Sequence, residues 1–141
     1  MPAAFSEFWY IAYHTLFWLD LYLSGSPEED FTPPALFLWT EGNPAVSPEQ
    51  PYTKEELLTY LAATRRTCHA TLFALTDERA HQTISSYPWT GEQGVSILEL
   101  HLYTMRHVQE HAAQLLLFLG QHGIPDEALT TVARAKHGHQ T

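Results

Sequence analysis

The sequence has little positive charge and a single cysteine. Only 7 of its 141 residues are Lys or Arg, against 16 Asp or Glu, which gives a formal net charge of −9. Proteins that bind nucleic acid need clustered basic residues to displace counterions, so no nucleic-acid partner is expected. Cys68 alone can form neither an intrachain disulfide nor a cysteine-rich zinc site. Its isolated thiol favours a reducing, cytoplasmic setting.

The chain also lacks a hydrophobic run of the length that crosses a membrane. Its most apolar stretch, Phe8 to Leu23, has 16 residues and is interrupted by His14 and Asp20, whereas a membrane span needs about 20. No basic region precedes this stretch, as a signal peptide would require, and acidic residues follow it. We therefore predict a core helix here and no membrane partner.

The rest of the composition is that of a single folded domain, which we predict to be helical and to span residues 1–141. Apolar residues make up 45% of the chain and charged residues 16%, which suits a continuous core. Apolar residues recur at intervals of three and four in three segments, as they do on one face of a helix. No strand-like alternation of comparable length occurs, so the fold class predicted is all-α. The predicted elements are helices at about Ser6–Leu23, Thr53–Leu75 and Ser96–His122, with a weaker C-terminal helix at about Asp126–Lys136.

A loop of nearly 30 residues separates the first two predicted helices. Loops of this length without their own structure are uncommon in compact domains and are often functional. This loop holds six prolines but also large apolar side chains, so we expect it to pack over the helices. Trp39 in this loop, and Trp89 in the connection between the second and third helices, are candidates to line a substrate pocket.

The third helix carries two histidines on its apolar face. Residues four apart differ by only about 40° around a helix, so His107 and His111 project side by side, one turn apart. This geometry suits two ligands of one metal ion. The alternative is a pair of buried histidines, each hydrogen-bonded to a neighbour. The stripe that they share is Leu100, Thr104, His107, His111, Leu115 and Phe118.

The string HVQEH also fits H-x-x-E-H, the inverted zinc-protease signature, with Glu110 as general base. Such a protease needs a further acidic ligand well downstream, and the only acids after His111 are Asp126 and Glu127. Glu110 also lies about 100° from His111 around the helix. A metalloprotease is therefore the less favoured interpretation.

Two segments together carry a family resemblance. WYIAYHTLFWLDLYL (Trp9–Leu23) and RHVQEHAAQL (Arg106–Leu115) occur in this order, separated by a helix and a long loop. They resemble the first histidine helix and the second histidine motif of the DinB-like family of four-helix-bundle metalloproteins. The resemblance implies an up-down helical bundle and a metal-binding triad of His14, His107 and His111, whose ring nitrogens should lie within about 4 Å of one another if ligand bonds are near 2.1 Å.

Three neutral imidazoles bind a divalent ion and leave it an open coordination position. The metal ion expected at this site is Zn²⁺ or Ni²⁺, with Fe or Mn as alternatives. Gln114, one turn beyond His111, is placed to steady that histidine or a metal-bound water; an ordinary exposed amide is the alternative.

The resemblance further implies a cytoplasmic enzyme class that includes thiol-dependent transferases and isomerases acting on small molecules. A hydrolase of similar metal chemistry is also consistent with the triad. A low-molecular-weight thiol is therefore an expected partner, and catalytic residues beyond the metal ligands are not identified. The alternative is a non-catalytic metal-binding or dimerising helical module.

Members of that family usually carry a helix before the first histidine helix, whereas here about five residues precede it. The first predicted helix is apolar around most of its circumference. Two neighbouring helices would leave an aromatic stripe that a monomer rarely exposes. We therefore predict a homodimer with this helix at or near the interface, and the long loop folding back over it is the alternative.

Overall fold

The computed structural model describes residues 7–37 and 50–124, and in this part the chain is mostly helical. The predicted all-α class is confirmed. Among these residues, no helix combines the length and the apolar character needed to cross a membrane. The predicted C-terminal helix and Trp39 lie outside the described residues. In chain order the elements are α1 (Phe8–Ser24), η2 (Glu28–Asp30), α2 (Lys54–Phe73), α3 (Asp77–His81), β1 (Thr83–Ile84), η3 (Pro88–Thr90), β2 (Val95–Ser96) and α4 (Ile97–Gln121).

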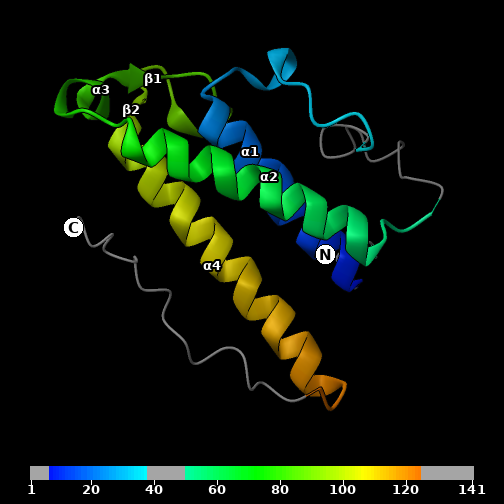
Figure 1. Cartoon of the computed structure of the whole chain (residues 1–141). Helices are drawn as coiled ribbons and strands as arrows, with labels where there is room; N and C mark the ends of the chain where they lie inside the picture. The colour runs from blue at the N-terminus through cyan, green and yellow to red at the C-terminus, as the bar shows by residue number, and fades with distance from the viewer. Residues whose placement is uncertain (1–6, 38–49, 125–141) are drawn as a thin grey trace, which may run out of the picture.

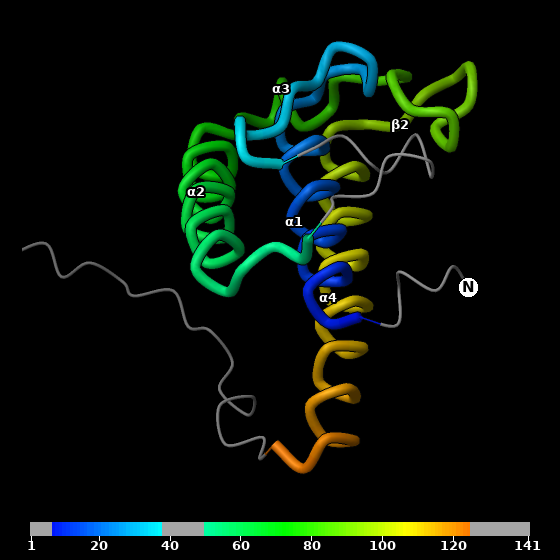
Figure 2. Tube along the Cα trace, turned by 90° about the vertical axis from the view of Figure 1, so that its right-hand side faces the viewer, coloured from blue at the N-terminus to red at the C-terminus, as the bar shows by residue number. Residues whose placement is uncertain are grey.

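Helix α1 lies between α2 and α4 and packs against both of them (Figure 2). Helices α1 and α2 run in the same direction and α4 runs in the opposite one (Figure 1). The long connection therefore returns the chain to the end where α1 began. Helices α2 and α4 approach each other near α3 and splay apart towards the other end of the bundle (Figure 1).

Capping residues fix where the helices begin. The Thr53 hydroxyl accepts a hydrogen bond from the Glu56 backbone N–H, and the Glu56 carboxylate accepts one from the Thr53 N–H. Ser96 and Glu99 make the same reciprocal pair at the start of α4. Both helices therefore begin with a capping box, which explains their predicted starts at Thr53 and Ser96. Beyond the other end of α4, Gly123 has φ +70°, a left-handed conformation that favours glycine and ends the helix.

The side chains of α1 form the centre of the core. Tyr13, Phe17 and Leu21 are fully buried. Phe31 packs edge-on against Phe17 at 5.5 Å between ring centres, and Phe37 stacks on Tyr13 at 5.8 Å. The connection that follows α1 therefore folds back over this helix, which is the predicted alternative to the pairing of two chains there. No large apolar side chain of α1 is exposed within the described residues.

The acidic residue in the apolar stretch of α1 links this helix to α2. The Tyr60 hydroxyl donates a hydrogen bond of 3.0 Å to the Asp20 carboxylate. Burial raises the pKa of Asp20 above its usual value, although this hydrogen bond partly offsets the effect. Burial likewise raises the pKa of Tyr60, and the nearby Asp20 charge raises it further. Asp20 therefore belongs to the α1/α2 interface and not to the histidine cluster.

Helix α2 buries a narrower face than its sequence pattern predicts. Leu61 and Leu72 belong to the apolar stripe that spacings of three and four predict for this helix, yet they are 45% and 50% exposed. The residues that are fully covered are Tyr60 and Thr64, and Cys68 is half-buried. The physical reason is that α2 packs on α1 but makes no comparable contact with α4. One neighbouring helix covers only part of an apolar stripe.

A small antiparallel sheet joins the end of α3 to the start of α4, where no strand was predicted. Thr83 pairs with Ser96, and Ile84 with Val95. Strands of two residues are too short to show an alternating pattern in the sequence. A side chain at Gly94, which has φ +68°, would come within 2.5 Å of the Ile84 carbonyl oxygen. Glycine is therefore required there for the hairpin to close.

An apolar groove with a volume of about 560 Å³ opens where α2 and α4 splay apart. Residues near the start of α1 form its floor, and leucines of α2 and α4 form its walls. Leu58 is 51% exposed, although it lies on a groove wall. The side chains that define this groove are Phe8, Ala12, Leu58, Leu61, Leu115 and Leu119.

We expect two copies of the chain to pair over this groove. Exposed leucines are covered when the same surface of a second copy packs on them, and the basic side chains of Lys54 and Arg65 beside the groove weaken the repulsion between two acidic chains. Light scattering at micromolar concentration should give twice the chain mass of 16.1 kDa. Leu61→Glu should give the monomer mass, whereas Leu36→Glu, at a site 66% exposed outside the groove, should not. A wild-type monomer would contradict the pairing.

Candidate metal centre

The three predicted histidines converge between α1 and α4. His14 comes from α1, and His107 and His111 come from α4. The His14 ring centre lies 5.3 Å from that of His107 and 4.6 Å from that of His111, and the two α4 rings are 4.4 Å apart. One nitrogen from each ring lies within 4.8 Å of the other two. The predicted convergence is confirmed, although the ring nitrogens lie within 4.8 Å of one another where about 4 Å was expected.

The close packing of α1 on α4 brings the rings together. His14 is only 9% exposed, and the Nδ1 atoms of His14 and His107 are both buried. On α4, Leu100 and Thr104 precede the histidines on the same face and are buried against α1. The first part of the stripe thus packs α4 against α1, and the next two turns of α4 place the imidazoles of His107 and His111 beside His14.

Gln114 fixes the orientation of one imidazole. Its side-chain oxygen lies 2.7 Å from Nδ1 of His111. An amide oxygen only accepts hydrogen bonds, so this contact corresponds to the tautomer of His111 in which Nδ1 carries the proton and donates. Nε2 of His111 therefore keeps its lone pair, and this atom lies 3.1 Å from Nε2 of His107. Gln114 thus presents His111 in the tautomer that a metal ligand requires.

The donor set fits a divalent transition metal. Bonds of about 2.1 Å in a tetrahedral arrangement place donor nitrogens about 3.4 Å apart. The two α4 nitrogens are already at 3.1 Å, and the His14 donor lies within 4.8 Å of both, within reach of a small side-chain rotation. No fourth His, Cys, Asp or Glu joins the cluster among the described residues. Three imidazole ligands therefore leave at least one coordination position for another molecule.

Aromatic rings surround the histidines, and the sequence analysis missed most of them. Tyr10 stacks beside His14 with 6.5 Å between ring centres, and Trp18 meets the same imidazole edge-on at 6.3 Å. Tyr103 is nearly parallel to His107 at 6.5 Å. The signal was present in the sequence, since each of these rings lies four residues from a histidine on the same helix.

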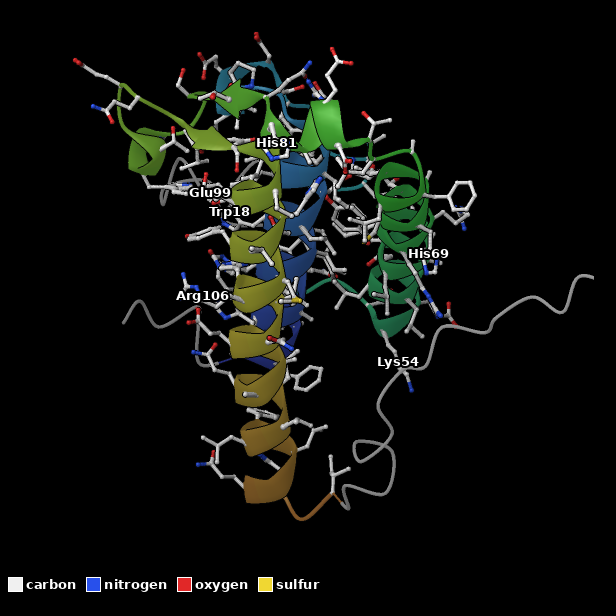
Figure 3. The ribbon with its side chains drawn as sticks, turned by 90° about the vertical axis from the view of Figure 1, so that its left-hand side faces the viewer. Trp18, Lys54, His69, His81, Glu99 and Arg106 are labelled. Carbon is white, nitrogen blue, oxygen red and sulfur yellow. The ribbon has the colours of Figure 1, made fainter. Side chains whose placement is uncertain are left out.

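Trp89 extends this aromatic surface outwards from α4. It stacks on Tyr103 with 4.0 Å between ring centres and an angle of 21°. Burial raises the pKa of Tyr22 well above its usual range, while a hydrogen bond from Trp89 to its hydroxyl acts in the opposite direction. Trp18 and Arg106 lie on the side of the α1/α4 pair that faces away from α2 (Figure 3). Trp89 is thus connected to the histidines through Tyr103.

The sequence matches the DinB superfamily over residues 3–115. The chain belongs to the DinB superfamily. The matched region contains all three histidines and Gln114, and it ends within α4. No curated protein and no solved structure matches the chain.

The structure of this DinB-superfamily chain disfavours a protease role for Glu110. The Glu110 carboxylate accepts a hydrogen bond from Arg106 on the same helix, and its side chain is 52% exposed. A general base must reach a water or substrate at the metal. Glu110 instead lies on the solvent side of α4, because it is a quarter-turn away from His111.

If Gln114 orients His111, its removal should weaken metal binding in this DinB-superfamily protein. Gln114→Leu is expected to lower the affinity for Zn²⁺ by about 10-fold to 100-fold, the usual effect of losing a hydrogen bond to a ligating histidine. Gln114→Glu retains an acceptor and should bind close to the wild-type level. Competition with a coloured chelator measures both. Gln109→Leu is the matched control on an exposed position of α4, and an equal loss there would contradict the orienting role.

Proposed function

We propose that this chain binds one divalent metal ion through His14, His107 and His111 and is a metal-dependent enzyme acting on a small molecule. The observation that carries the proposal is the convergence of three imidazoles without a fourth His, Cys, Asp or Glu among the described residues. Structural zinc sites are usually closed by four protein ligands, whereas catalytic sites keep a position open. The donor set therefore supports catalysis over a purely structural site.

Zn²⁺ or Ni²⁺ suits three imidazoles best, with Fe or Mn as alternatives. Such an ion supplies Lewis acidity and lowers the pKa of a thiol or water that reaches its open position. The protein's own contribution is to hold the three rings in place. His14 is fixed in the most buried helix, and Gln114 sets the tautomer of His111.

We propose a thiol-dependent transferase or isomerase, or a hydrolase, as the reaction class, with a low-molecular-weight thiol as a partner. Membership of the superfamily supports this class, and the aromatic surface beside the histidines gives a small molecule a surface to bind. A reducing cytoplasm would keep such a thiol and Cys68 unoxidised. The individual substrate does not follow from the fold.

Cobalt substitution tests the open coordination position. The full chain loaded with Co²⁺ should show visible absorption bands of a four- or five-coordinate site, and adding 2-mercaptoethanol or azide should change them. Thiolate should also add a charge-transfer band in the near ultraviolet. His107→Ala should lose these features, and His69→Ala, exposed on α2, should retain them. Bands that neither molecule alters would instead support the non-catalytic metal-binding module.

A further inference from the structure

The side of the α1/α4 pair that faces away from α2 carries a continuous aromatic surface beside the histidines. Trp89 is 40% exposed and stacks on Tyr103, which in turn lies parallel to His107. Trp18 meets His14 from the same side (Figure 3). A planar ring loses little conformational freedom when it packs on such a surface and gains offset-stacked or edge contacts there. We call Trp89, Tyr103 and Arg106 the aromatic–arginine face.

Arg106 gives this face a positive charge in a chain with a formal net charge of −9. Its guanidinium carbon lies 5.0 Å from the centre of the Tyr103 ring, and its side chain is 57% exposed. One guanidinium nitrogen donates to Glu110. A guanidinium has five N–H donors, so donors remain for a second carboxylate, in the planar geometry that arginine favours.

From these contacts we propose that the aromatic–arginine face selects planar, anionic small molecules. The ring of such a molecule lies against the exposed part of Trp89, and its carboxylate pairs with Arg106, which lies beside it over Tyr103. The Arg106 guanidinium is 5.0 Å from Tyr103, and Tyr103 is 6.5 Å from His107. One small molecule can therefore contact Arg106 and still reach the histidines. This inference deepens the proposed function, on which it rests, by naming a substrate class.

A cationic ligand is the main alternative, because aromatic rings also bind cations through their faces. Two observations favour an anion. The Arg106 guanidinium already occupies a position over Tyr103 and would repel a second cation. The nearest carboxylate to it, Glu110, is engaged in an ion pair with Arg106. A divalent ion at the histidines would add further positive charge to the same side.

The test uses three probes of similar size and the full chain without added metal, in the presence of a chelator. Cinnamate is planar and anionic, cinnamamide is planar and neutral, and 3-cyclohexylpropanoate is anionic without a planar ring. Affinities are measured by NMR from the indole N–H signals of the tryptophans, with the Trp89 signal identified from Trp89→Phe. We expect cinnamate to bind about 10-fold more tightly than either other probe and to shift the Trp89 signal most, as one charge-assisted contact implies.

Variants separate the two parts of the recognition. Arg106→Gln should reduce cinnamate affinity to that of cinnamamide, and Trp89→Leu should reduce it to that of 3-cyclohexylpropanoate, with Trp89→Phe close to wild type. Arg66→Gln, exposed on α2, is the charge-matched control and should change nothing. Equal binding of the three probes, or cinnamate binding that survives Arg106→Gln, would overturn the inference. Because metal is absent, this result is independent of whether the histidines bind an ion.

Discussion

Zn²⁺ or Ni²⁺ at about 100 times its dissociation constant is expected to raise the melting temperature of this protein by about 5 to 10 °C. An ion that binds only the folded state adds about 2.7 kcal/mol to the free energy of unfolding at that concentration. A domain of this size gains about 2 to 4 °C for each kcal/mol. The unfolded chain offers no preassembled site, because His14 is more than 90 residues from His107.

His111→Ala should remove this thermal shift and leave the helical circular dichroism unchanged. The variant loses one donor and the hydrogen bond to Gln114, but His111 is only half-buried, so little packing is lost. His69→Ala, an exposed histidine on α2, should keep the full shift. The measurement is differential scanning fluorimetry with and without chelator. Identical melting of wild type under both conditions would contradict metal binding by the folded state.

Phe17→Ala is expected to lower the free energy of unfolding by about 3 to 5 kcal/mol. Phe17 is 0% exposed and contacts Tyr13, Trp18 and Phe31, so its loss leaves a cavity at the centre of the core. The free energy of unfolding of a typical domain is only about 5 to 15 kcal/mol, so this loss is a large share of it. Urea denaturation followed by circular dichroism measures the change.

Phe73 provides the matched control for this core variant. It is also a helical phenylalanine, but its side chain is 96% exposed at the end of α2. Phe73→Ala should change the free energy of unfolding by less than about 0.5 kcal/mol. Similar losses for the two variants would show that α1 is not the centre of the core, and that His14 is not held on a rigid helix.

The parts of the fold that depend on local sequence were predictable. Thr53 and Ser96 each begin a helix because their capping partners lie three residues ahead in the same segment. His107 and His111 share a face because a helix repeats every 3.6 residues. His14 is different, since no spacing connects it to α4. Only the resemblance to the DinB-like family placed it with the other two, and the packing of α1 on α4 confirms that they converge.

The parts that depend on tertiary packing were not predictable. The apolar residues of α1 indicated burial on several sides, and the loop was expected to pack over the helices, but periodicity could not show that Phe31 and Phe37 are the side chains that cover α1. Conversely, Leu61 lies on the expected stripe of α2 yet stays exposed, because no helix of the described chain packs on that side. Periodicity shows which face of a helix is apolar, whereas the neighbours available decide how much of that face is buried.

The role of Trp89 illustrates the same limit within the candidate site. Its position between two short strands gave no reason to place it beside α4. The hairpin of Thr83–Ile84 with Val95–Ser96 brings it onto Tyr103, and through that ring to His107. A pairing of strands only two residues long thus positions an exposed ring of the aromatic–arginine face.

Metal content tests the central proposal most directly. The full chain, purified without a histidine tag, is incubated with excess Zn²⁺ or Ni²⁺, desalted and analysed by inductively coupled plasma mass spectrometry. Retention of one ion per chain is expected for wild type, with almost none for His14→Ala and for His107→Ala. Wild type that retains no ion, or a His14→Ala variant that retains as much as wild type, would contradict a metal centre formed by His14, His107 and His111.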